Sequence, residues 1–486
     1  MPAIITSKFR VHNSEQFQEA FSEASGNTFY LGIGRPQEFT TSTRGDDRTN
    51  NEGTDLLPVT PPDNVNTQNY TYDDLLAVKK VISTNVGFVI PRRNWTTGTV
   101  YDYYRHDIGE YITGTTTAST TNSGATTLYD AKFYVLSSTR NVYKCLDNND
   151  NAFSTVEPSG TSTIIQLTAD GYKWKYMYTL TASQQADFLS VDFMAVGTDS
   201  TVSTAAVDGA INVIKIKTPG SAGTDGTHTS VPIRGDGTGG VCSVTIASGA
   251  VTAATVTTPG TGYTFAYIRI ADINSAGGVA LITSELDVII EPIGGHGFNA
   301  VEELGGFFVM LNTSLEGTES GNSGDVTVAN DFRKVSLIRD PKSSGVAATA
   351  ATLRATTATV GSVSAGTFTV DEEINQASTG AVGTVIEWDS TNKILYFIQT
   401  RHNDEGIDSN GNQTAFSGTN IITGQSSSAT VTPDTTTGTV NNQTFSNGYS
   451  SSEIDHGSGD IVYVENRAPI TRAADQTENI KLIIEF

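Results

Sequence analysis

The residues of this sequence that could do chemistry include His296, which lies between two glycines and precedes Glu302 and Glu303. A histidine with two carboxylates nearby could form a catalytic cluster or hold a metal ion. A zinc site, however, needs a further ligand at a fixed spacing, and none of the usual zinc patterns is present. We therefore interpret His296 as a turn residue, and we expect no catalytic, cofactor or metal site.

Two other stretches carry part of a functional pattern. Residues 235–240 are glycine-rich, but they lack the Gly-Lys-Ser/Thr ending of a phosphate-binding loop and no helix follows them, so a hairpin turn is expected. Asp371, Glu372 and Glu373 could serve glycoside hydrolysis, but such carboxylate pairs are defined by their distance in space. Consecutive acidic residues are more typical of a solvated turn.

The only two cysteines, Cys145 and Cys242, lie far apart in the sequence. This number and spacing match neither a disulfide framework nor a metal motif. We expect each cysteine to be a small buried hydrophobic residue in a strand. Such cysteines suit a protein that folds and assembles in a reducing cytoplasm.

Composition and charge restrict the possible partners. A chain of 486 residues is long enough for about two to four domains, and its 47 glycines indicate many short strands and turns. No apolar run is long enough to span a membrane. The net charge of −23 argues against nucleic-acid binding, which needs clustered Lys and Arg. We therefore expect no nucleic acid, no membrane, and protein partners with basic or neutral faces.

Strand patterns dominate the elements that must position these residues. Alternating aromatic residues over 172–178 predict a strand paired with a strand at 164–167. Its aromatic face would pack in the core, which is the default, or against a partner. Paired strands are expected at 132–136 and 141–146, and helices at 13–26, 72–80 and 181–189. The fold class predicted is mainly β (β-rich α+β), multi-domain, with sandwich- or barrel-like modules and a few short helices.

Short blocks at both ends of the chain resemble one protein family, in matching order. The blocks are ITSKFR (5–10), TFYLGIGR (28–35), PPDNV (61–65), VIPRRNW (89–95), VYKCLD (142–147), DGYKWKY (170–176), YVENRAPI (463–470) and DQTE (475–478). The chain resembles the dimer-forming baseplate wedge subunit of T-even-type contractile-tailed bacteriophages. The resemblance does not extend to the middle of the chain.

The resemblance and the change in composition together suggest a division of the chain. The expected parts are 1–86, the N-terminal part of the main body; 87–204, a β-rich wedge domain with aromatic strands; 205–285, a Gly/Thr-rich β insert; 286–344, a return to the main body; 345–435, a small β-barrel or sandwich insert; and 436–486, C-terminal strands that close the main body.

The resemblance implies a structural virion protein of the tail baseplate rather than an enzyme. Such a subunit would form a homodimer and bridge neighbouring wedge proteins during tail assembly in the host cytoplasm, and its inserts could contact fibre-type components. The candidate interface residues are Arg92, Arg93, Trp95, Tyr463, Glu465, Asn466 and Arg467. Arginine and tryptophan are enriched at interface hot spots. Alternatively, an arginine of the 92–95 corner pairs internally and Trp95 fills the core.

The alternative function is a carbohydrate-binding or carbohydrate-cleaving tail fibre or spike protein that acts on the host surface. It would need exposed aromatic residues beside paired carboxylates. The best candidates are Tyr263, Phe265 and Tyr267, or Trp388 with Glu387. A tail spike usually shows a long, regular β-helix period, and the sequence has none.

Overall fold

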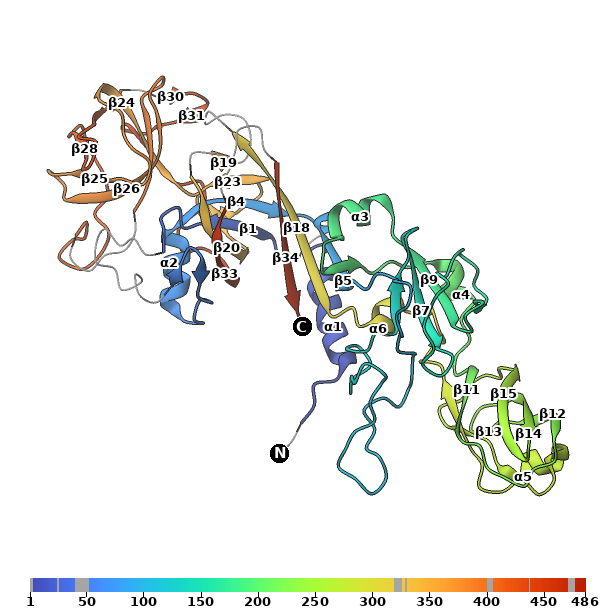
Figure 1. Cartoon of the computed structure of the whole chain (residues 1–486). Helices are drawn as coiled ribbons and strands as arrows, with labels where there is room; N and C mark the ends of the chain where they lie inside the picture. The colour runs from blue at the N-terminus through green and yellow to red at the C-terminus, as the bar shows by residue number, and fades with distance from the viewer. Residues whose placement is uncertain are drawn as a thin grey trace. The chain divides into compact units, whose positions relative to one another are not determined.

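The chain folds into two units, each built from segments that are distant in the sequence. The computed structural model describes residues 3–23, 26–39, 52–318, 326–327, 330–399, 405–436, 438–470 and 477–486. Unit 1 comprises Met1–Gln16, Gly87–Met310 and Ile483–Phe486, and unit 2 comprises Phe17–Val86 and Leu311–Leu482. Within the described residues the helices are few and short and strands dominate, which confirms the mainly β fold class (Figure 1). The six parts expected from the sequence remain a finer, predicted division.

Among the described elements, four continue from one unit into the other: α1 (Ser7–Glu19), β5 (Val86–Pro91), β18 (Phe308–Thr318) and β34 (Thr477–Glu485). The final strand β34 pairs with β18, and the amide of Phe486 donates to the carbonyl oxygen of Phe307 at 3.0 Å. Arg10 of α1 stacks on the Phe307 ring and donates to the carbonyl oxygen of Phe486. The C-terminal strand is therefore paired, as its apolar pattern predicts.

Besides α1, β18 and β34, the described elements of unit 1 are mostly strands, with four short helices and one π-helical turn. They are β5 (Val86–Pro91), β6 (Tyr134–Leu136), β7 (Asn141–Asp147), β8 (Gln166–Leu167), β9 (Lys173–Thr179), α3 (Ala182–Phe188), β10 (Phe193–Ala195), α4 (Ser200–Thr204), β11 (Ile211–Thr218), β12 (Gly226–Pro232), β13 (Arg234–Gly235), β14 (Val241–Ala247), β15 (Ala250–Thr258), β16 (Ala266–Tyr267), α5 (Ile270–Ile273), η2 (Asn274–Gly278), β17 (Glu285–Ile290) and α6 (Ala300–Leu304).

Aromatic residues fill the core around the sheet β6-β7-β9-β8. Trp174 and Tyr172 are fully buried and stack with ring centroids 5.5 Å apart. Tyr176 and Tyr178 are also buried, so the alternating aromatic face of β9 lies in the core rather than at an interface. Burial of large aromatic rings supplies much of the hydrophobic stabilisation available to a sheet of this size.

The glycine- and threonine-rich segment of unit 1 forms a β module of its own (Figure 1). β11 pairs with β17 where the segment leaves and rejoins the chain, and β12, β14 and β15 form a separate antiparallel sheet. Ile211, Val244 and Cys242 belong to one buried cluster inside this module. We call residues 205–290 the insert module below.

Unit 2 contains two larger sheets and several short hairpins. Its elements are β1 (Phe29–Gly34), β2 (Gly53–Thr54), β3 (Leu57–Pro58), α2 (Val65–Asp73), β4 (Leu75–Val81), η1 (Ser83–Asn85), β19 (Val326–Thr327), β20 (Phe332–Arg339), β21 (Lys342–Ser343), β22 (Val346–Ala347), β23 (Thr352–Arg354), β24 (Thr357–Ala365), β25 (Glu373–Gln376), β26 (Ala381–Asp389), β27 (Ile394–Ile398), β28 (Ile422–Gly424), β29 (Thr430–Pro433), β30 (Thr439–Val440), β31 (Gln443–Thr444), β32 (Tyr449–Ser450) and β33 (Asp460–Ile470).

One sheet of unit 2 has the order β23-β4-β1-β20-β33. The helix expected at 72–80 was wrong, because α2 ends at Asp73 and β4 follows directly. Leu75, Leu76 and Val78 are buried in β4, between β1 and β23. β33 is the edge strand of this sheet and runs over 11 residues.

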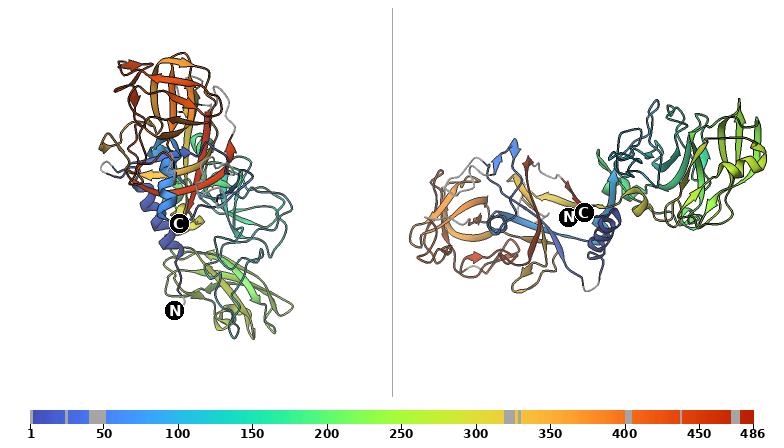
Figure 2. Two further views of the ribbon diagram at one scale, coloured as in Figure 1. Left: turned by 90° about the vertical axis from the view of Figure 1, so that its left-hand side faces the viewer. Right: turned by 90° about the horizontal axis from the view of Figure 1, so that it is seen from below.

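The second sheet of unit 2 curls into a small barrel. Its order is β27-β26-β25-β28-β29-β24, and a further pairing between β27 and β24 closes it, with β32 added beside β24. Figure 2 shows these orange strands from two further sides. Ile374, Phe397 and Val431 are fully buried inside it. Closure removes the exposed sheet edges that would otherwise attract other strands.

Candidate functional site

A buried charged cluster occupies the interior of unit 1 where β7 meets α6. The amine of Lys144, which is fully buried, donates to Glu303 Oε2 at 2.8 Å and lies 2.8 Å from His296 Nδ1. The amides of Gly297 and Asn299 donate to Glu303 Oε1 at 2.8 and 3.3 Å. Of the three residues singled out in the sequence, His296 and Glu303 belong to this cluster. No pattern in the sequence indicated Lys144, which completes it.

Glu302, the third residue of the sequence pattern, lies outside this cluster. It pairs with Lys8 at 3.0 Å and is partly exposed. The buried groups that remain satisfy one another, and no open carboxylate is left for substrate. This arrangement suits a structural role.

The electrostatics of the cluster favour an ionised Lys144–Glu303 pair beside a neutral histidine. Burial alone would raise the pKa of Glu303, but the Lys144 amine, together with His296, lowers it to about 2. Burial, together with the Lys144 charge, lowers the pKa of His296. His296 Nδ1 can then accept a hydrogen bond from the Lys144 amine.

The low pKa of Glu303 predicts a specific loss of stability in acid. Since 4.5 is its ordinary value, the contribution of Glu303 is fully present above pH 4.5 and is lost as the pH falls toward 2. We expect the difference in unfolding free energy between the wild type and Glu303→Gln to shrink by about 3 kcal/mol over this range. Urea unfolding at a series of pH values measures it. A difference that stays constant with pH would contradict the ionised pair.

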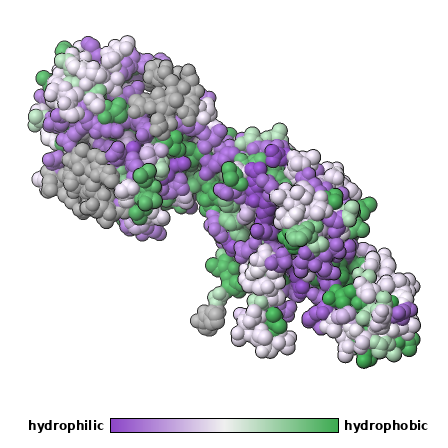
Figure 3. Space-filling view, viewed as in Figure 1, coloured by the Kyte–Doolittle hydropathy of each residue, from purple (hydrophilic) through white to green (hydrophobic). Residues whose placement is uncertain are grey.

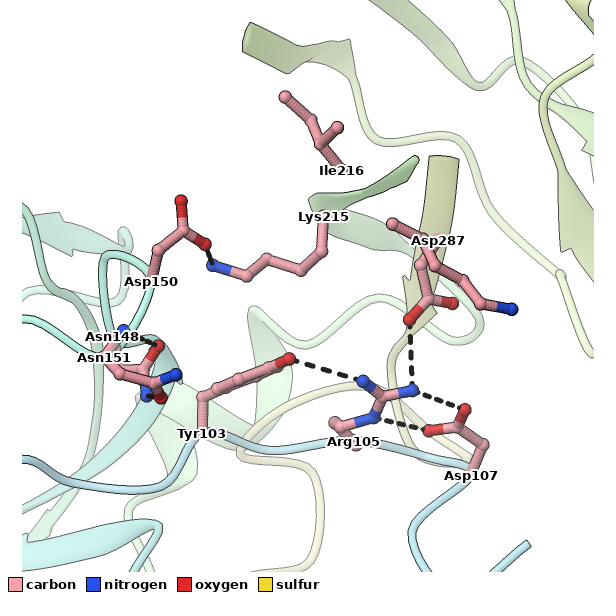
Figure 4. Close-up of a pocket in the computed structure, with 10 residues that line it drawn as sticks. Tyr103, Arg105, Asp107, Asn148, Asp150, Asn151, Lys215, Ile216 and Asp287 are labelled. Atoms are coloured by element: carbon pink, nitrogen blue, oxygen red, sulfur yellow. Dashed lines mark hydrogen bonds and ion pairs between the residues drawn. The ribbon is translucent and has the colours of Figure 1, made fainter. Parts of the chain in front are cut away.

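A polar cavity of about 380 Å³ lies between the insert module and the rest of unit 1 (Figure 4). On one side the amine of Lys215 lies 2.9 Å from Asp147 and 2.6 Å from Asp150. The same amine lies 5.2 Å from the centre of the Tyr103 ring. The strand β11 is thereby tied to the loop that follows β7.

On the other side of this cavity, Arg105 connects its own loop to strand β17 of the insert module. Its Nη2 lies 2.6 Å from Asp107 and 3.0 Å from Asp287 of β17, while Nη1 donates to the Tyr103 hydroxyl at 3.4 Å (Figure 4). The cations and carboxylates of the cavity therefore compensate one another. We interpret the cavity as a clamp that fixes the insert module rather than as a catalytic site.

The Arg92–Trp95 corner makes contacts within unit 1. Arg92 Nη1 donates to the carbonyl oxygen of Ser190 at 2.7 Å. Arg93 donates to backbone carbonyls of residues 129–131 and stacks 4.5 Å from the centre of the Tyr134 ring. Trp95 Nε1 donates to Ser154 Oγ at 3.1 Å. These contacts match the alternative of internal pairing, and the interface assignment for Arg92, Arg93 and Trp95 remains a prediction.

A small hairpin in unit 2 exposes two leucines. β2 pairs with β3, and the hairpin carries Leu56 in its turn and Leu57 at the start of β3, which are 90% and 77% exposed. The hairpin is anchored, because the buried Arg333 donates from Nε to both oxygens of Asp55 at 3.0 Å. These leucines are thus held outward by a fixed turn, which sequence reasoning missed although two leucines stand out in a polar stretch.

The edge strand β33 lies next to this hairpin. Asn466 Nδ2 donates to the carbonyl oxygen of Val59 at 3.0 Å. On the other face of the strand, the Tyr463 hydroxyl donates to Glu465 Oε2 at 2.7 Å, and Arg467 lies 4.0 Å from Glu465. The structure therefore places Tyr463, Glu465 and Arg467 on one face of β33 and Asn466 on the other.

Two polar atoms of this strand are left without a partner. Asn466 Oδ1 and Arg467 Nε are buried and form no hydrogen bond with the described part of the chain. Buried polar atoms nearly always have a partner in a complete structure.

We call the surface formed by Leu56, Leu57 and β33 the hairpin–edge surface.

The three consecutive acidic residues 371–373 and the glycine-rich residues 235–240 make contacts within the fold. Glu372 is buried and accepts hydrogen bonds from the backbone and side chains of Ser426 and Ser427. In the glycine-rich run, a Cβ at Gly237 would lie 2.4 Å from the ring of the buried Tyr263. The run therefore packs against an aromatic ring and does not cradle a phosphate.

Of the aromatic residues considered for sugar binding, Tyr263 is buried, whereas Phe265 and Tyr267 are exposed. Trp388 is half-buried and packs against Phe368 with ring centroids 5.1 Å apart. In the described part of the chain, no group of three or more His, Cys, Asp or Glu residues could hold a metal ion. No helix among the described residues is long and apolar enough to cross a membrane.

Comparison with known proteins identifies the family. The family model described as Bacteriophage T4, Gp8 matches residues 3–169 and 410–486, which is half of the chain. No curated protein matches the chain. The matched ranges contain both parts of the hairpin–edge surface, but they omit the insert module and most of the barrel. The chain therefore belongs to the Gp8 family of bacteriophage T4, and it is a structural protein of the phage tail baseplate wedge.

Proposed function

We propose that this baseplate protein forms a homodimer and bridges neighbouring wedge proteins during tail assembly, without catalysis. The observation that supports this most is the hairpin–edge surface, which lies within the ranges matched by the family. It combines Leu56 and Leu57 with the predicted interface residues Tyr463, Glu465, Asn466 and Arg467. The Arg92–Trp95 corner is a less favoured interface because its side chains have internal partners.

The physical argument starts from the two leucines. Fully burying one leucine side chain stabilises a complex by about 1.5–3 kcal/mol. The pair between Arg333 and Asp55 already fixes the turn, so little conformational freedom is lost when a partner binds. In a dimer with two-fold symmetry, the same surface of both subunits meets its copy.

The edge strand adds polar contacts to this apolar centre. β33 is the edge strand of its sheet, and strand edges readily pair with another chain. The two cysteines, Cys145 and Cys242, are free and buried, which agrees with assembly in the reducing host cytoplasm. The insert module and most of the barrel lie outside the residues that the family model matches. For these parts, fibre-type components are further candidate partners.

Light scattering of the full chain tests the proposal. A chain of 51.5 kDa should give about twice this mass as a dimer. We expect Leu56→Asp to weaken the dimer at least about tenfold, because a buried unpaired carboxylate replaces an apolar contact.

The matched control is Val191→Asp in unit 1. Val191 is 86% exposed and Leu56 is 90% exposed, so both changes add one carboxylate at an exposed apolar position. Val191→Asp should leave the dimer unchanged. A monomeric wild type at high concentration would contradict dimerisation, and a Leu56→Asp dimer of unchanged affinity would exclude the hairpin–edge surface.

A further inference from the structure

We propose that the insert module carries a binding site for an acidic saccharide, formed by Phe265, Tyr267, Arg234 and Arg269. This activity is separate from the proposed assembly function. The site lies outside the ranges matched by the Gp8 family. It combines a stacking surface for sugar rings with two guanidinium groups that can bind a carboxylate.

The stacking surface is built by the pairing of β13 with β16. Arg234 lies opposite Tyr267 in the register, so both side chains lie on the same face. Phe265 is two residues from Tyr267, and the two rings are 5.4 Å apart at their centroids with an interplanar angle of 40°. Phe265 is 61% exposed and Tyr267 is 40% exposed. A ligand can therefore reach both rings.

A glycine makes this geometry possible. A Cβ at Gly235 would lie 1.9 Å from the carbonyl oxygen of Phe265. No side chain fits at that distance, so Gly235 allows the two segments to approach closely. Asp236, the next residue, accepts hydrogen bonds from the amides of Thr264 and Phe265 at 2.9 and 3.0 Å. The segment that carries the aromatic pair is thereby fixed before any ligand binds.

The two arginines are held by one carboxylate. Arg234 donates from Nε and Nη2 to the oxygens of Asp272 at 3.1 and 2.9 Å. Arg269 donates from the same two nitrogens to Asp272 at 3.0 and 3.1 Å. Both guanidinium groups remain about half exposed. These bonds use the Nε–H and one N–H of Nη2, so each arginine can still offer both N–H groups of Nη1 and the second N–H of Nη2 to a ligand.

Two guanidinium groups are gathered at this site within a protein whose net charge is −23. Both pair with Asp272, while the other carboxylate of the site, Asp236, accepts hydrogen bonds from Thr264 and Phe265. Hydrogen bonds from Arg234 and then Arg269 hold the pKa of Asp272 far below its usual range. The pKa of each arginine is raised by Asp272 and also by Tyr267. The charges therefore persist across the physiological pH range.

This combination fits an acidic saccharide better than other anions. Sugar rings present flat C–H faces that stack on aromatic rings, and guanidinium groups bind carboxylates in a defined geometry. A nucleic acid would require many more cationic contacts than two arginines provide. A large protein interface usually has a continuous apolar centre. In the visible face of the insert module, by contrast, small apolar patches stand among neutral and polar residues (Figure 3).

Calorimetric titration of the full chain with matched saccharides tests the site. The probes are hexagalacturonate with its methyl ester, and 3′-sialyllactose with its methyl ester; the members of each pair differ only in whether their carboxylates are charged. We expect at least one acidic probe to bind about tenfold more tightly than its neutral counterpart. Phe265→Ala/Tyr267→Ala and Arg234→Gln/Arg269→Gln should each weaken this binding at least about tenfold.

The matched control is Phe153→Ala/Tyr111→Ala, which removes one exposed phenylalanine and one exposed tyrosine elsewhere in unit 1. These residues are 66% and 71% exposed. The control should bind like the wild type, and circular dichroism should show all variants folded. Absence of binding to both acidic probes, or undiminished binding by the folded aromatic variant, would overturn the proposal. Equally tight binding of a hexaglutamate peptide would assign the surface to an acidic protein segment instead.

Discussion

Glu303→Gln should destabilise the protein by about 3–5 kcal/mol, because it leaves the fully buried amine of Lys144 without its counter-ion. Glutamine has nearly the same size as glutamate, so the change tests charge rather than packing. Burial by itself lowers the pKa of Lys144, and the Glu303 carboxylate opposes this effect. Urea unfolding at neutral pH measures the loss.

The neighbouring residue offers the control for this prediction. Glu302 is partly exposed, and its partner Lys8 is mostly exposed, so Glu302→Gln should cost about 0–1 kcal/mol. The two variants differ by one position in the sequence and remove the same charge. Equal losses for Glu302→Gln and Glu303→Gln would contradict the assignment of the buried pair.

Lys334→Met should destabilise unit 2 by about 3–5 kcal/mol and also weaken the dimer. Lys334 is buried, and its amine lies 3.2 Å from Asp74 and 3.3 Å from Glu52. Without the amine, two carboxylates remain close together in the interior. Glu52 directly precedes the β2–β3 hairpin, so the hairpin that presents Leu56 also loses an anchor.

Thermal unfolding and light scattering of the same samples separate these two effects. Lys342→Met is the control, since Lys342 is exposed and also lies in unit 2. It should change neither stability nor mass. If Lys334→Met is as stable as the wild type, the ion pairs of Lys334 with Asp74 and Glu52 contribute little to stability. If the variant is destabilised but still dimeric, the hairpin does not depend on Lys334 for its part in the dimer.

The strands with aromatic or strictly alternating patterns could be predicted from the sequence. The face formed by Tyr172, Trp174, Tyr176 and Tyr178 was predicted to lie in the core, and it does. A two-residue period of large apolar side chains leaves few alternatives to a half-buried strand. The closing strand β34 was predicted from the mostly apolar run of residues 480–486.

The segment Tyr72–Lys80 shows where local patterns fail. Leu75, Leu76 and Lys79 have a spacing that suits one side of a helix, yet Leu75–Val81 forms β4. β4 lies between β1 and β23, so its residues are buried by strands that are distant in the sequence. Such tertiary pairing overrides local propensity and has no signature within the segment itself.

The sequence identified some residues of the candidate sites, but it did not show which residues would lie next to them. Sequence reasoning singled out His296 and Glu303, but their partner Lys144 lies in a strand 152 positions before His296. It also named Phe265 and Tyr267, but not Arg234 or Arg269. The two arginines meet at Asp272 only because β13 pairs with β16. Long-range pairing decides such clusters.

Cryo-electron microscopy of tails that contain this protein tests the central claim most directly. The account predicts two copies in each baseplate wedge, with Leu56 and Leu57 of each copy buried against a neighbouring chain. A single copy per wedge, or hairpins that face solvent in the assembled baseplate, would contradict the proposed dimer and its surface.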